Sequence, residues 1–162
     1  MLVWGHSQGT AVAVHMVAEE QDSGAGLLVL ESPYNSMEGQ IRSTLPWHLR
    51  AIVLNLVGLK SIDLEFLSTK WTAQVNWPML ILHTEDDHKI PPKLSEQILE
   101  ETKGKSSPIS RILFSKDFGF RHNDIYQFPN LQELVTKFEV NAIDTKGSTI
   151  NCSPENMDSY LN

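Results

Sequence analysis

The sequence contains a single cysteine, Cys152, and has no long apolar run, no long basic run and no visible internal repeat. A lone cysteine excludes a disulfide within the chain. No apolar stretch approaches the length of a membrane-spanning helix, and the first residues do not follow the pattern of a signal peptide. A net charge of −7 without a basic segment argues against nucleic acid as the main partner.

The remaining composition is that of a globular protein, with 162 residues, 41% of them hydrophobic and 20% charged. Short apolar runs alternate with segments of helical periodicity, and this order predicts an α/β fold with a mostly parallel sheet flanked by helices. The predicted strands cover residues 2–4, 26–30, 79–83 and 111–114, and the predicted helices cover 10–19, 92–102 and 131–138.

Two segments depart from this alternation. Residues 34–74 carry many apolar side chains without one clean period, which predicts short helices inserted between strands. Long insertions in compact domains are often functional, so this one is interpreted as a lid over the site or, alternatively, as an ordinary helix packed on the sheet. Residues 141–162 turn polar and small, and we predict a disordered tail there after a partial domain at 1–140.

The motif with the clearest chemical meaning is GHSQG at residues 5–9. It lies between a predicted strand and a predicted helix, which is the context of a G-x-S-x-G nucleophile elbow. The turn would project the Ser7 hydroxyl above the sheet, and the flanking glycines would let strand and helix approach closely. The backbone N–H of Gln8 would face the oxygen that becomes an oxyanion. A glycine-rich turn with a capping serine is the alternative.

A serine nucleophile needs a base and an acid that orients the base, and in this fold they follow the serine in the order acid, then histidine. Glu85, Asp86 and Asp87 follow the third strand. We select Asp87, which lies three residues before Ile90-Pro91, with Asp86 as the alternative acid and a solvated acidic turn as the other interpretation.

The general base is selected from the positions of the histidines along the chain. His122 follows the fourth strand and has no histidine after the acid loop as a rival, so we select it, with an exposed loop histidine as the alternative. His83 is interpreted as a structural histidine at a strand end, His88 as a surface residue, and His6 as a support for the turn. No H-x-x-x-H pair occurs and the lone cysteine lies in the tail, so we expect neither a metal nor a cofactor.

Together these segments resemble the α/β-hydrolase domain-containing protein twelve group, which are membrane-anchored serine lipases acting on lysophosphatidylserine and monoacylglycerol. The resemblance spans residues 2–140 and depends on GHSQG at 5–9, LESPY at 30–34, LILHTEDD at 80–87 and GFRHNDIY at 119–126. It implies Ser7 as nucleophile, Asp87 as acid and His122 as base. The group usually has leucine where this chain has Gln8, which bears on substrate preference and not on the backbone donor.

The resemblance also implies the C-terminal part of an α/β-hydrolase fold whose N-terminal half is missing. That half would hold the membrane anchor of an endoplasmic reticulum enzyme, the early strands and a second oxyanion donor. The expected substrate is a lipid ester. One alternative is that the same triad cleaves a protein thioester or a small ester. Another is that the chain is an inactive truncated fragment or a binding module. The oligomeric state is left open.

Overall fold

The computed structural model describes residues 1–20, 26–36, 39, 41, 44–56, 69–105, 107–141, 147–157 and 159. Within them, five parallel strands form one sheet, and their order in space follows their order in the chain. The strands are β1 (Leu2–His6), β2 (Leu27–Glu31), β3 (Met79–Thr84), β4 (Ile109–Phe114) and β5 (Thr149–Cys152).

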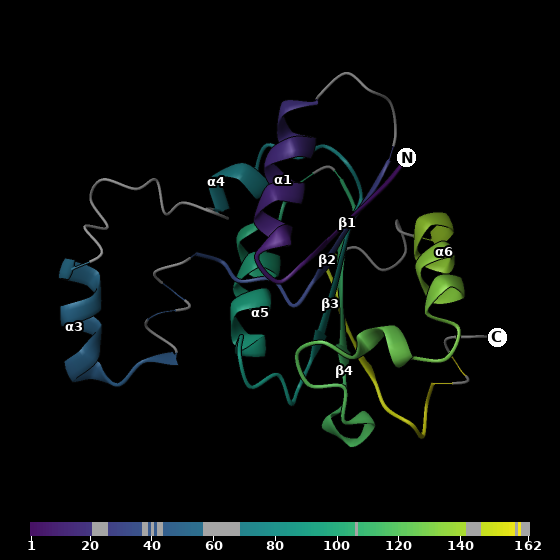
Figure 1. Cartoon of the computed structure of the whole chain (residues 1–162). Coiled ribbons are helices and arrows are strands. Elements are labelled where there is room, and N and C mark those ends of the chain that lie inside the picture. The colour runs from purple at the N-terminus through teal and green to yellow at the C-terminus, as the bar shows by residue number, and fades with distance from the viewer. Residues whose placement is uncertain are drawn as a thin grey trace.

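Helices cover both faces of the sheet (Figure 1). On one face lie α1 (Gly9–Glu19), α5 (Pro92–Glu101) and the short α4 (Thr69–Thr72), and on the other lies α6 (Leu131–Asn141). Each face has its own apolar core, and β2 and β3 are buried along their whole length between the two. Strands buried on both faces are expected to be continuously apolar, as these are. The predicted α/β class with a parallel sheet is confirmed.

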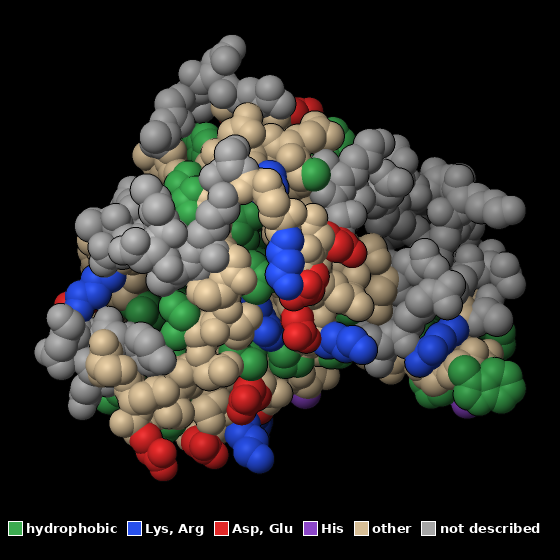
Figure 2. All heavy atoms as spheres, turned by 180° about the vertical axis from the view of Figure 1, so that it is seen from behind, with side chains coloured by type: hydrophobic (Ala, Val, Ile, Leu, Met, Phe, Trp, Pro, Cys, Tyr) green, Lys and Arg blue, Asp and Glu red, His purple; other side chains and the backbone are tan. Residues whose placement is uncertain are grey.

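Helix α3 (Trp47–Leu56) belongs to the predicted insertion and lies to one side of these layers (Figure 1). It exposes several apolar side chains, with Trp47 79% and Ile52 52% accessible. Figure 2 shows hydrophobic side chains at the end of this projecting part. Residues 57–68 of the insertion lie outside the described residues, so the lid stays a prediction. None of the described helices combines the length and apolar character needed to cross a bilayer.

The prediction of a disordered tail from residue 141 is wrong for residues 149–152. These form β5, which pairs in parallel with β4 in the register Arg111↔Thr149 to Phe114↔Cys152. Cys152 is buried and Ile150 packs on the α6-side core, while Thr149 and Asn151 are exposed. Exposed and inward-facing residues alternate here as in a strand, but over only four residues of a mostly polar segment, so the sequence pattern did not indicate a strand.

Strand β1 is an edge of the described sheet, because it pairs with β2 alone. Its side chains on the α6 side, Leu2 and Trp4, are 55% and 38% exposed. A groove of about 390 Å³ runs between them and α6, where Leu131 and Val135 contribute to its lining. An edge with unpaired backbone groups and an apolar face is a region prone to association.

Candidate active site

Ser7 lies in the tight turn between the end of β1 and the start of α1. Its backbone is left-handed, with φ of 51°, a conformation that costs energy for a residue with a side chain. The turn is held on both sides, since the Ser7 amide donates to the Glu31 carbonyl at 2.9 Å and the Thr10 hydroxyl donates to the Ser7 carbonyl at 2.6 Å. These bonds fix the serine at the carboxyl edge of the parallel sheet.

The two glycines of the elbow have different roles. A Cβ at Gly5 would lie 2.6 Å from the carbonyl oxygen of Gly9 and 2.7 Å from the Cα of Thr10. A Cβ at Gly9 would meet no atom within 4 Å. Close approach of strand and helix therefore requires glycine at position 5 only, and the expectation that both glycines permit it is corrected for Gly9.

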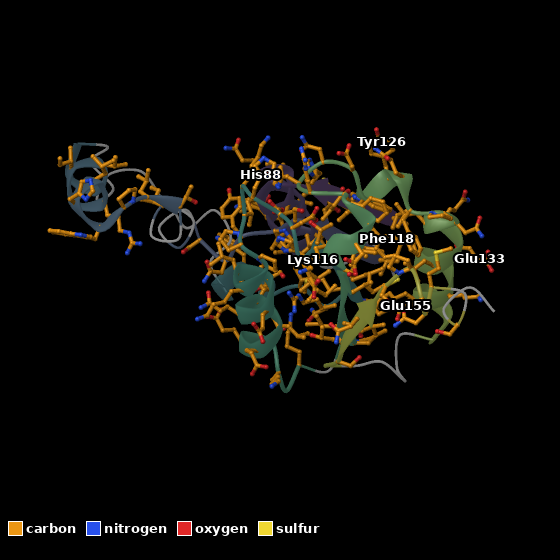
Figure 3. The ribbon with its side chains drawn as sticks, turned by 90° about the horizontal axis from the view of Figure 1, so that it is seen from below. His88, Lys116, Phe118, Tyr126, Glu133 and Glu155 are labelled. Atoms are coloured by element: carbon orange, nitrogen blue, oxygen red, sulfur yellow. The ribbon has the colours of Figure 1, made fainter. Side chains whose placement is uncertain are left out.

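His122 lies in the loop after β4, and a cluster of phenylalanines anchors that loop. Phe118 and Phe120 stack with ring centroids 4.9 Å apart, and both contact the rings of Phe114 and Phe128. His122, which follows this cluster in the loop, is 3% exposed. Figure 3 views the molecule from the carboxyl ends of the strands, with Phe118 labelled between Lys116 and α6.

The three residues selected from the sequence meet at this edge. The Nε2 atom of His122 lies 3.0 Å from the Ser7 hydroxyl, and its Nδ1 atom lies 2.8 Å from Oδ2 of Asp87. Both distances are within hydrogen-bond range. With Nδ1–H donating to the carboxylate, Nε2 is left as the acceptor for the serine proton.

Asp87 is 7% exposed and is surrounded by donors. Its Oδ1 accepts the amides of Lys89 and Ile90, both at 2.9 Å. Burial by itself raises the pKa of this carboxyl, but the hydrogen bonds from His122, His83, Ile90 and Lys89 outweigh it and hold the pKa of Asp87 well below its usual range. Asp87 is therefore ionised wherever the protein is folded near neutral pH.

The residues just before Asp87 bind the backbone of the His122 loop. Oδ1 of Asp86 accepts the Arg121 amide at 3.0 Å, and the Thr84 hydroxyl donates to the Arg121 carbonyl at 2.5 Å. Glu85 accepts the Lys116 amide at 3.1 Å. Asp86, the alternative acid, thus contacts the loop backbone, while the described contact with the His122 ring is made by Asp87. His88 is exposed, and Figure 3 shows it at the periphery.

His6 has a contact that the sequence did not reveal. Its Nε2 lies 3.0 Å from the His122 carbonyl, so Nε2–H donates to it, and the two imidazole rings are 5.1 Å apart. The elbow therefore holds the backbone of His122 as well as facing its ring. The only signal in the sequence was the position of His6 directly before Ser7, and it was interpreted as support for the turn alone.

Gln8 precedes the first residue of α1, where amides point out of the helix with a partial positive charge. Within the described part of the chain, the Gln8 amide has no hydrogen-bond acceptor. Its N–H is therefore available to an acceptor outside the helix. Among the described residues, no three His, Cys, Asp or Glu side chains are grouped as metal ligands.

The chain was compared with known proteins by sequence and by structure. No family model matches the chain. Lysophosphatidylserine lipase ABHD12 of Danio rerio is 29% identical over 153 residues, which is 85% of this chain and 39% of that protein. Protein ABHD12B of Homo sapiens is 28% identical over 149 residues, covering 84% of this chain and 40% of that protein. The chain resembles the ABHD12 proteins. It spans about two fifths of the length of these curated relatives.

Solved structures show the same architecture. The acylaminoacyl peptidase of Pyrococcus horikoshii superposes with a TM-score of 0.58 at 15% identity, over 85% of this chain and 23% of that chain. An esterase of Pyrococcus furiosus superposes with a TM-score of 0.51 at 16% identity, over 88% of this chain and 52% of that chain. At such identities the similarity concerns the fold, which is that of the α/β-hydrolases.

The two elbow glycines provide a matched test of the turn. We expect Gly5→Ala to destabilise the protein and displace Ser7, because the new methyl group would overlap backbone atoms that cannot move independently. Gly9→Ala should leave stability unchanged or raise it by up to about 1 kcal/mol, because alanine favours the helix. Thermal or urea unfolding of both variants measures the difference. Equal stability of the two would contradict the packing described for Gly5.

Proposed function

We propose that the chain is a serine hydrolase of ester bonds in which Ser7 is the nucleophile, His122 the general base and Asp87 the acid that orients it. The observation that carries the proposal is the continuous line of hydrogen bonds from the Ser7 hydroxyl through His122 to Asp87, at 3.0 and 2.8 Å. The resemblance to proteins named lipases, over most of this chain, supports the same reaction class.

The chemistry follows from this geometry. Ser7 Oγ attacks the ester carbonyl carbon while its proton passes to Nε2 of His122, and Asp87 stabilises the resulting imidazolium. The carbonyl oxygen becomes negative and accepts the Gln8 amide. Collapse of this intermediate breaks the bond to the alcohol, which leaves with the proton from Nε2. Water then attacks the acyl-serine with His122 again acting as base, and the acid product leaves with Ser7 restored.

We further propose that the substrate is a lipid ester, such as a lysophospholipid or a monoacylglycerol. The relatives carry the name lysophosphatidylserine lipase, and their similarity to this chain is the first support. The second is α3, which presents Trp47, Leu49 and Ile52 to solvent. An apolar surface of this kind is suited to an acyl chain or a lipid interface. On the same similarity, we propose action at a membrane surface, that of the endoplasmic reticulum by the resemblance of the sequence motifs.

Substitution of the three residues tests the triad. Ser7→Ala and His122→Ala should each remove nearly all esterase activity, and Asp87→Asn should lower kcat by about 10⁴-fold because the histidine loses the tautomer that accepts the serine proton. Asp86→Asn is the matched control, since asparagine keeps an oxygen to accept the Arg121 amide. Rates of hydrolysis of p-nitrophenyl acetate and of lysophosphatidylserine measure these changes. A fully active Ser7→Ala variant would refute the proposal, and strong loss in Asp86→Asn with none in Asp87→Asn would reassign the acid.

The lipid assignment is tested on α3. Replacing Trp47 and Ile52 together by serine should lower turnover of long-chain monoacylglycerol about a hundredfold, because roughly 3 kcal/mol of apolar contact is removed, and should leave p-nitrophenyl acetate hydrolysis unchanged. Met16→Ser, which alters another exposed apolar side chain, is the control. Equal effects on both substrates, or none on the lipid, would contradict a lipid contact at α3.

A further inference from the structure

His83 is the next-to-last residue of β3, just before the acid loop, and its side chain is completely buried. Its Nε2 atom lies 2.9 Å from the carbonyl oxygen of Ile90 and 3.3 Å from Oδ2 of Asp87. A carbonyl and an ionised carboxylate only accept hydrogen bonds, so Nε2 carries the hydrogen. One N–H is therefore shared between the acid of the proposed triad and the loop that follows it.

The other nitrogen of His83 shows that the imidazole is not simply a space-filling group. Within the described residues, Nδ1 of His83 is buried and has no hydrogen-bond partner. A buried nitrogen without a partner costs free energy, whereas an apolar side chain of similar volume would avoid that cost. An apolar side chain at this position could not make the two contacts of Nε2, with the Ile90 carbonyl and with Asp87.

We propose that His83 is a positioning residue for Asp87, because it contacts Oδ2, the carboxylate oxygen that the loop amides do not bind. Oδ1 of Asp87 is held by the Ile90 amide, the Ile90 carbonyl is held by His83, and His83 also contacts Oδ2. These contacts close a ring through carboxylate, loop and imidazole. The inference rests on the proposed function, because it assigns a task only if Asp87 orients His122.

This closed set of contacts explains how His83, which is buried and touches no substrate, influences the reaction. Oδ2 of Asp87 is the atom that receives the Nδ1–H of His122 at 2.8 Å. Without the His83 donor, the turn from Asp87 to Ile90 loses one of its anchors and the carboxylate is free to shift. A misplacement of about 1 Å at a catalytic group can lower the rate about a hundredfold. The loss should appear in kcat, with KM unchanged.

Three substitutions separate positioning from packing. His83→Gln keeps an N–H donor near the position of Nε2, His83→Asn places its amide nearer the unpartnered Nδ1, and His83→Leu has no donor. We expect kcat to fall about tenfold to a hundredfold in His83→Asn and His83→Leu and to recover in His83→Gln. His83→Asn keeps the comparison available if the leucine variant fails to fold. Circular dichroism and thermal unfolding report the folded state of each.

Nuclear magnetic resonance of the ¹⁵N-histidine-labelled chain gives a readout that needs no activity. We expect His83 to be protonated at Nε2, and the downfield Nδ1–H resonance of His122 to be present in wild type and His83→Gln but broadened or lost in His83→Asn. A His83 protonated at Nδ1, or an unchanged His122 resonance and kcat in folded His83→Asn, would overturn the inference. Failure of the proposed function is distinct, since Ser7→Ala would then hydrolyse esters as wild type does, whatever happens at position 83.

Discussion

Both oxygens of the Asp87 carboxylate are buried at the carboxyl end of β3, and a buried carboxylate is stable only when donors surround it. The donors come from the acid loop, from β3 itself and from the His122 loop. Meeting this requirement joins segments that lie 35 residues apart in the sequence. The orientation of His122, and with it the contact between Nε2 and the Ser7 hydroxyl, depends on where this carboxylate is held.

The parallel sheet makes such a meeting possible. In parallel strands all carboxyl ends lie at one edge, so the loops after β1, β3 and β4 emerge side by side. The strand order places β2 between the elbow and the acid loop, and the Ser7 amide donates to the last residue of β2. Phenylalanine packing then turns the loop after β4 back toward the elbow, where His6 holds its backbone. The sheet topology thus brings the loops together, and side-chain contacts then fix their positions.

Much of this arrangement could be predicted from the sequence, because its signals are local. The G-x-S-x-G spacing marks the elbow, and the apolar runs mark the buried strands. The interval from Asp87 to Ile90-Pro91 has a physical cause, since the Asp87 carboxylate accepts the Ile90 amide just before the proline that leads into α5. The choice of His122 followed from chain order alone.

Other features depend on contacts between distant residues and have no local signal. β5 is short and polar, and forms because β4 offers an unpaired edge to a segment in which Ile150 and Cys152 alternate inward. The bonds of His6 and His83 to the histidine and acid loops cannot be seen before the loops are brought together. For Gly9 the motif suggested a feature that the structure lacks. The motif predicted that glycine is needed there for close packing, but a Cβ at Gly9 would meet no atom within 4 Å.

The most direct test of the account is covalent labelling of the whole 162-residue chain with a fluorophosphonate, followed by mass spectrometry of its peptides. An assembled triad makes Ser7 far more nucleophilic than any other serine. The account predicts one adduct per chain, located on Ser7, with labelling slowed strongly in His122→Ala. Absence of an adduct on a folded chain, or labelling spread over several serines at the same rate in wild type and His122→Ala, would contradict it.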